Sequence, residues 1–148
     1  MLIKAINWKA TLFGTSDIVY KGRLFFLSIN FPDNYPIDPP KVCFITPIYH
    51  VNVNATISVG ESLGRVVFSN LEWWKLEYSI REILSQVYAL FYIADPYTPY
   101  GLERLIEFLE ERPIYSEKSK YFTKKYASLS NERQEYPSDK DWDFSVHK

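Results

Sequence analysis

The hydrophobic period of the chain changes near its middle, and this change limits the folds that it can adopt. In the first half, Ile6, Trp8, Ala10 and Leu12 alternate with polar residues, the period-2 pattern of a strand with one buried face. In the second half, apolar residues recur at the spacing of an amphipathic helix; they are Ile80, Ile83, Leu84, Val87, Tyr88 and Phe91. The two patterns together predict an α+β domain.

The boundaries of the expected elements follow from turn residues and helix caps. Strands are expected over residues 3–13, 24–31 and 42–46, with a short fourth strand around Val66. Helices are expected over residues 79–92, 102–110 and 117–129, the last two separated near Pro113. Ser79 and Glu82 have the spacing of a capping box at the start of the first helix.

A proline-rich connector lies between the second and third expected strands. Residues 35–40 contain Pro36, Pro39 and Pro40, which remove backbone donors and force extended backbone on the residues before them. The connector therefore cannot be a helix or a central strand. An aromatic residue before proline raises the population of the cis isomer, and a tight turn can select it, so we predict a cis Tyr35–Pro36 peptide.

Size, charge and cysteine content exclude several classes of protein. The 148 residues suffice for one core, and 17 basic against 18 acidic residues leave no global field to attract nucleic acid. Cys43 is the only cysteine, which excludes an intrachain disulfide and fits a reducing compartment. No apolar run approaches the roughly 20 residues that span a bilayer, so we expect no membrane insertion and a cytoplasmic or nuclear location.

Residues with catalytic potential are few. The chain has no Gly-rich phosphate loop, no Cys-x-x-Cys and no His-x-x-x-His, so we expect neither a cofactor nor a metal. Cys43 and His50 could form a thiolate and base pair. A cysteine within a strand is more often a small hydrophobic residue.

Several motifs in fixed order are similar to those of the ubiquitin-conjugating enzymes. They are Phe31-Pro32-x-x-Tyr35-Pro36-x-x-Pro39-Pro40-Lys41-Val42-x-Phe44, His50-x-Asn52, and Trp74 shortly before a helix. The resemblance extends from Trp8 to Leu129 and implies a four-stranded antiparallel meander, a long active-site loop, a central helix and two C-terminal helices. It places the domain at residues 1–129 and a polar tail at 130–148. Only seven residues precede Trp8, too few for the N-terminal helix of that family.

The departures from the family pattern fall on the catalytic positions. Active members carry the modifier on a cysteine as a thioester, and the resemblance places Val67 where that cysteine would be. The His-Pro-Asn motif reads His50-Val51-Asn52, without its proline, and we expect Asn52 to be structural here. The resemblance therefore implies a pseudoenzyme that acts as a protein-binding scaffold or cofactor.

The resemblance leaves several partners open. A ubiquitin-conjugating enzyme variant would bind ubiquitin or an active conjugating enzyme. The Fused Toes type, which the helix exit at residues 91–95 and the tail resemble more, would join a Hook-type adaptor complex. Tyr136, Trp142 and Phe144 in the tail are candidate anchors for a partner. The alternatives are an active enzyme that uses Cys43 and a shared fold with an unrelated function.

Overall fold

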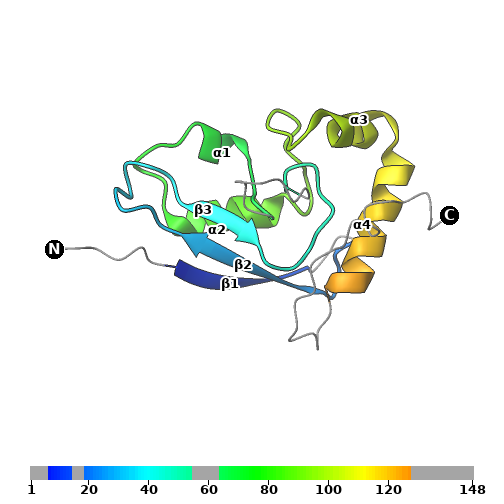
Figure 1. Ribbon diagram of the computed structural model, residues 1–148, viewed down its shortest axis with the longest axis horizontal. Coiled ribbons are helices and arrows are strands. Elements are labelled where there is room, and N and C mark those ends of the chain that lie inside the picture. Colours follow the sequence, from blue (N-terminus) through cyan, green and yellow to red (C-terminus); the bar gives the residue numbers. More distant parts are fainter. Residues whose placement is uncertain (1–6, 15–18, 55–63, 128–148) are drawn as a thin grey trace.

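The computed structural model describes residues 7–14, 19–54 and 64–127 and has the expected α+β architecture (Figure 1). The elements in chain order are β1 (Asn7–Phe13), β2 (Leu24–Asn30), β3 (Lys41–Phe44), α1 (Ser69–Glu72), α2 (Ile80–Ala89), α3 (Leu102–Glu110) and α4 (Arg112–Tyr126). In Figure 1, α3 and α4 lie together at one end of the molecule.

The sheet is antiparallel in the order β1-β2-β3. Leu27 lies opposite Ala10 on one side and Phe44 on the other, and all three pack in the core beneath the sheet. The predicted alternation of the first strand is confirmed at Ala10 and Leu12, which contact the core, and at Thr11, which is exposed. Trp8, which was expected on the buried face, is 50% exposed and contacts the edge of the core at Phe31. Ile6 lies outside the described residues.

The prediction of a fourth strand around Val66 was wrong for the described residues. Arg65 and Val66 form only isolated bridges, to Cys43 and Val53. The backbone of residues 64–67 runs between β3 and residues 52–54 and divides its hydrogen bonds between these neighbours. Val66 N–H donates to Val42, while Val67 N–H donates to Asn52. No continuous ladder with either neighbour results.

The central and C-terminal helices are present, but several boundaries differ from the prediction: α2 ends at Ala89 rather than at residue 92, and the short helix α1 was not expected. The capping box of α2 is confirmed, since Ser79 Oγ accepts from Glu82 N–H and the Glu82 carboxylate accepts from Ser79 N–H. α4 begins at Arg112, five residues before the expected start. Pro113 lies in its first turn, where the missing N–H costs nothing because that turn has no intrahelical acceptor for it.

The proline-rich connector adopts the predicted cis peptide between Tyr35 and Pro36. Trp74 packs against the connector, and its indole N–H donates to the Pro36 carbonyl at 2.8 Å. The Tyr35 ring lies between those of Phe31 and Trp74, with centroids 4.9 and 6.3 Å away. The connector, the end of the second strand and Trp74 are therefore neighbours in space.

Two clusters of buried side chains hold these elements together. The sheet core lies between the sheet and α2 and contains Phe25, Leu27, Ile29, Val42, Phe44, Val53, Val66, Ile83, Val87 and Phe91, among others. The tyrosine cluster lies at the helical end and contains Tyr49, Val51, Tyr115, Phe122 and Tyr126. Among the described residues, no helix combines the length and apolar character needed to span a membrane.

Candidate functional site

The structure brings together the two segments that carry the altered catalytic motif. Val67 N–H donates to the Asn52 carbonyl at 2.9 Å. Val67 is partly buried and contributes to the wall of an open cavity of about 610 Å³. The other lining residues are Glu72, Trp73, Tyr97, Thr98, Pro99, Tyr100 and Gly101.

Asn52 uses its whole side chain to hold the loop after α2. Nδ2 donates to the carbonyls of Asp95 and Thr98 at 2.8 and 2.9 Å, and Oδ1 accepts from Asp95 N–H at 2.9 Å. An amide has two N–H donors, and both are engaged. The side chain, which is fully buried, therefore has no hydrogen left to donate to an oxyanion in the cavity.

His50 is buried and neutral. Nδ1 accepts from Asn52 N–H at 3.0 Å, so the ring proton is on Nε2, which lies 2.8 Å from the Leu90 carbonyl and donates to it. Burial lowers the pKa of His50 to about 4, although the hydrogen bond to Leu90 acts in the opposite direction. Neither nitrogen has a free lone pair with which to accept a proton from a nucleophile.

Cys43 lies away from this arrangement. It is on β3 opposite Ser28 and next to Arg65, whereas its neighbours Val42 and Phe44 belong to the sheet core. The residue is only 8% exposed and does not line the cavity beside Val67. The two His50 nitrogens bond to Asn52 and Leu90, so the suggested pairing with Cys43 is not formed.

Asp95 fixes the other side of the cavity, a role that the sequence did not predict. One carboxylate oxygen accepts from the backbone and hydroxyl of Ser69 at 2.9 and 2.6 Å, and the other accepts from Tyr97 N–H at 3.0 Å. Burial alone would raise the pKa of this carboxyl, but the hydrogen bonds from Ser69 and Tyr97 lower it below its ordinary value. The bond from Tyr97 N–H to the Asp95 side chain, two residues earlier, is typical of an Asx turn. An aspartate directly before Pro96 is the sequence feature that could have predicted this turn.

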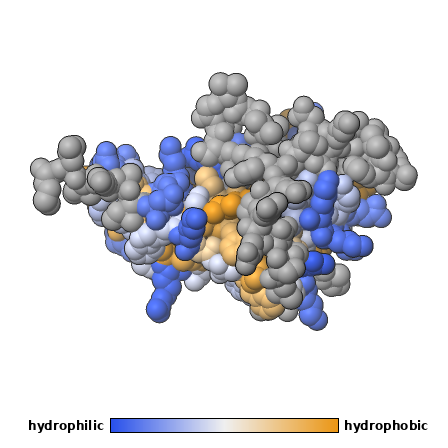
Figure 2. Space-filling model, turned by 60° about the horizontal axis from the view of Figure 1, so that its bottom comes forward, coloured by the Kyte–Doolittle hydropathy of each residue, from blue (hydrophilic) through white to orange (hydrophobic). Residues whose placement is uncertain are grey.

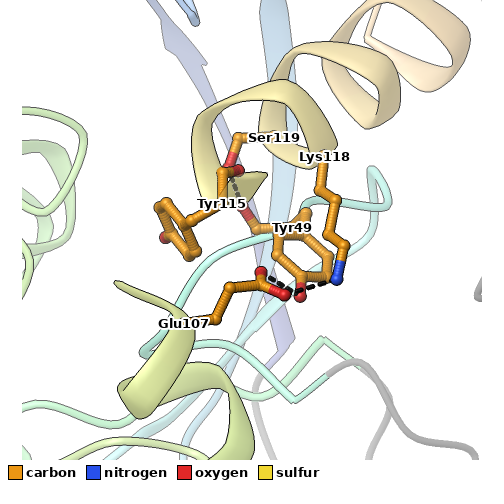
Figure 3. A network of polar contacts seen from close by, with 5 residues as sticks. All are labelled: Tyr49, Glu107, Tyr115, Lys118 and Ser119. Carbon is orange, nitrogen blue, oxygen red and sulfur yellow. Dashed lines mark hydrogen bonds and ion pairs between the residues drawn. The ribbon is translucent and has the colours of Figure 1, made fainter. Parts of the chain in front are cut away.

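A polar network in the tyrosine cluster holds Tyr49, just before the motif (Figure 3). Tyr49 OH donates to one carboxylate oxygen of Glu107 at 2.8 Å, and Lys118 forms an ion pair with the other. The guanidinium of Arg104 lies 4.2 Å from the centre of the Tyr49 ring, and burial raises the pKa of Tyr49. This network was also missed from the sequence, because its members are up to 69 positions apart.

α4 contacts the same segment through two further polar groups. Ser119 Oγ lies 3.1 Å from the Tyr49 carbonyl and 2.9 Å from that of Tyr115 (Figure 3). Val51 N–H donates to the Tyr115 hydroxyl at 3.0 Å. Residues 49–52 are therefore held by α4 on one side and by the loop after α2 on the other.

The candidate partner-binding residues are the aromatic residues of the C-terminal tail and the exposed apolar residues of the sheet. Tyr136, Trp142 and Phe144 lie outside the described residues. On the side of the molecule that Figure 2 brings forward, apolar side chains gather between hydrophilic ones. Among the exposed apolar residues of the sheet are Trp8 and Phe13 of β1, which are 50% and 45% exposed.

Comparisons with known proteins agree with this fold. The family model for ubiquitin-conjugating enzymes matches residues 3–123. Among solved structures, the chain is similar to a crystal structure of a Plasmodium yoelii protein assigned as a ubiquitin-conjugating enzyme. The two are 26% identical with a TM-score of 0.68, and the match covers 82% of this chain and 76% of that one. The chain therefore belongs to the ubiquitin-conjugating enzyme family.

Proposed function

We propose that this chain is a catalytically inactive member of the family that acts by binding other proteins. The proposal depends on the identity of Val67, whose backbone N–H donates to the Asn52 carbonyl. The family resemblance assigns the thioester cysteine to the position of Val67, and Val67 lines the cavity there. A valine side chain has no atom that can attack a thioester or leave from one.

The surrounding polar groups support the same conclusion. The Asn52 amide gives both hydrogens to the loop at residues 95–98, and His50 has both ring nitrogens engaged. An oxyanion needs donors aimed at the reacting atom, and a thiol needs a base or a positive charge to become nucleophilic. Neither Asn52 nor His50 can supply these functions in this arrangement.

Thioester formation is the direct test. Wild-type protein, the Cys43→Ser variant and an active conjugating enzyme would be incubated separately with activating enzyme, ATP and ubiquitin. We expect a reducible ubiquitin adduct only on the active enzyme. A reducible adduct on the wild type that disappears in Cys43→Ser would overturn the proposal and favour the enzyme hypothesis. Val67→Cys alone should charge poorly, since the Asn52 amide stays engaged.

The Fused Toes type is our first proposal for the kind of relative. The two C-terminal helices, the helix exit at residues 91–95 and the aromatic residues Tyr136, Trp142 and Phe144 support it. In that case the partners are proteins of a Hook-type adaptor complex. The exposed Trp8 and Phe13 on β1 favour a second candidate, binding of ubiquitin or an active conjugating enzyme.

Affinity purification from cells separates the two candidates. Recovery of ubiquitin together with an active conjugating enzyme, weakened by Trp8→Ala, would favour the variant. Recovery of coiled-coil adaptor proteins, lost when residues 130–148 are deleted, would favour the scaffold and the proposed tail anchors.

A further inference from the structure

The outer side of α3 carries a row of exposed aliphatic side chains. Leu102, Ile106 and Leu109 are 69%, 44% and 59% exposed. Their spacing of four and then three residues places them along one face of the helix. α3 lies at the upper edge of the molecule in Figure 1, above α4. The row spans about 10 Å, or two helical turns.

The rotation of α3 about its axis is fixed by polar contacts on its inner side. Arg104 donates to the carbonyls of His50 and Val53 at 3.2 and 3.0 Å, and Glu107 binds Tyr49 and Lys118. Leu105 and Phe108 pack against the tyrosine cluster on the inner side. Arg104 and Glu107 form their bonds beside them, and the aliphatic row faces solvent.

The surface beside the row is negative. Glu103 and Glu110 are exposed and each follows a member of the row by one position. Within the described part of the chain, no cation forms an ion pair with either carboxylate. Of the nearest basic residues in the sequence, Arg104 is partly buried with its guanidinium over the Tyr49 ring, and Arg112 is exposed with its guanidinium over the Phe108 ring.

We infer that this face of α3 is a docking surface for an amphipathic helix of another protein. The partner helix would carry aliphatic residues at the same four- and three-residue spacing, the pattern of a two-helix seam. Lysine or arginine beside that stripe would face Glu103 and Glu110. The inference rests on the proposed protein-binding function and specifies its surface and the chemistry of its partner.

The C-terminal tail of this chain is a poor candidate to cover the exposed face of α3, because the tail is acidic. Residues 128–148 contain five acidic residues against three lysines and arginines, so the segment would repel the glutamates beside the row. A basic helix from another protein complements both the apolar row and its acidic border.

Site-specific photo-crosslinking in cells tests this surface. p-Benzoylphenylalanine would replace Ile106 in one full-length protein and Ile37 in another, since Ile37 is 69% exposed on the connector. Crosslinked peptides would be identified by mass spectrometry. We expect Ile106, but not Ile37, to capture a segment of another protein that has an aliphatic stripe flanked by lysine or arginine.

A synthetic peptide of the captured segment then gives the affinity. Ile106→Asp should raise its Kd about tenfold or more, whereas Ile37→Asp should leave it within about twofold. Reversing both charges, with Glu103→Lys and Glu110→Lys, should raise the Kd about fivefold, and this effect should shrink in high salt. Circular dichroism melting would verify that the variants fold, as expected for exposed positions.

The inference is overturned by any of four results: no capture above the Ile37 control, capture of residues 128–148, capture of a second copy, or capture of a segment without basic flanks. An unchanged Kd in Ile106→Asp would also overturn it. Failure here is distinguishable from failure of the proposed function. A protein that forms no thioester and captures nothing at Ile106 remains a noncatalytic binder, with its binding surface elsewhere.

Discussion

The sheet core and the tyrosine cluster both bury large side chains, but they hold them in different ways. In the sheet core, aliphatic and phenylalanine side chains from β1, β2, β3 and α2 contact one another without polar partners of their own. In the tyrosine cluster, the hydroxyls of Tyr49 and Tyr115 bond to Glu107 and to the backbone of Val51. The first region depends mainly on packing, with hydrogen bonds from Tyr20 and Trp74 at its edges, and the second depends on packing together with specific hydrogen bonds.

The segment His50-Val51-Asn52 and the adjoining Val53 connect these two regions. Val51 belongs to the tyrosine cluster and Val53 to the sheet core, while Asn52 between them binds the loop at residues 95–98. His50 reaches the end of α2 through the Leu90 carbonyl. The comparison shows that polar groups of this segment serve the structure on both sides.

The largest effects are expected from removing one phenylalanine from each region. Phe25 and Phe122 are both fully buried, so Phe25→Ala and Phe122→Ala should each lower the free energy of unfolding by about 3–5 kcal/mol. Since residues 50–54 join the regions, chemical denaturation should show a single transition in both variants. Two separate transitions, or a loss below about 1 kcal/mol for Phe122→Ala, would break the comparison.

A smaller effect is expected from pH, through His50. Its pKa is about 4 in the folded protein and about 6.5 when unfolded. The unfolded state therefore binds the proton more readily. The stabilisation is fully present above pH 6.5 and is lost as the pH falls from 6.5 to 4. Lowering the pH from 7 to 5 should reduce the free energy of unfolding by about 2 kcal/mol.

Between pH 7 and 5 the loss of stability comes from His50 and not from Asp95. The pKa of Asp95 is lowered, so its contribution to stability is lost only as the pH falls below about 3.8. The His147→Gln variant is the control and should keep the same pH dependence. A histidine signal titrating near pH 6.5 in the nuclear magnetic resonance spectrum of this variant would contradict the assignment, because His50 is then the only histidine.

The smallest effect tests whether the hydroxyls of the tyrosine cluster contribute to stability. Tyr49→Phe removes the donor to Glu107 but keeps the ring, and it should lower the free energy of unfolding by about 1–2 kcal/mol. Tyr97→Phe makes the same change on a side chain that is 83% exposed, and it should cost less than about 0.5 kcal/mol. Equal effects would mean that the Tyr49 hydroxyl does not stabilise the tyrosine cluster.

The sheet core was largely predictable from the sequence. Strand alternation, the capping box at Ser79 and the geometry of the Tyr35–Pro36 peptide are local properties, and the structure agrees with each. Two of the exceptions were the expected fourth strand and the start of α4. The first depends on how residues 64–67 share their bonds between two neighbours, and the second on a proline that a helix tolerates in its first turn.

The tyrosine cluster and the partners of Asn52 could not be predicted in the same way. The family resemblance directs attention to Asn52, but its partners at Asp95 and Thr98 are 43 and 46 positions away. Tyr49 and Glu107 are 58 positions apart. No hydrophobic period marks such pairs, because they depend on how the elements pack rather than on local sequence.

The structural role of Asn52 is tested most directly by the unfolding free energy of Asn52→Ala, compared with Asn34→Ala. The first variant leaves Asp95 N–H and the carbonyls of Asp95 and Thr98 without their partner. We expect it to lose at least about 3 kcal/mol, since each buried group left unsatisfied costs about 1–3 kcal/mol. Asn34 is exposed, and its replacement should cost below about 1 kcal/mol. Asn52→Asp, which keeps the size but loses both donors, should be as unstable as Asn52→Ala. If Asn52→Ala were no less stable than Asn34→Ala, the amide of Asn52 would not be committed to the structure and the central claim would fail.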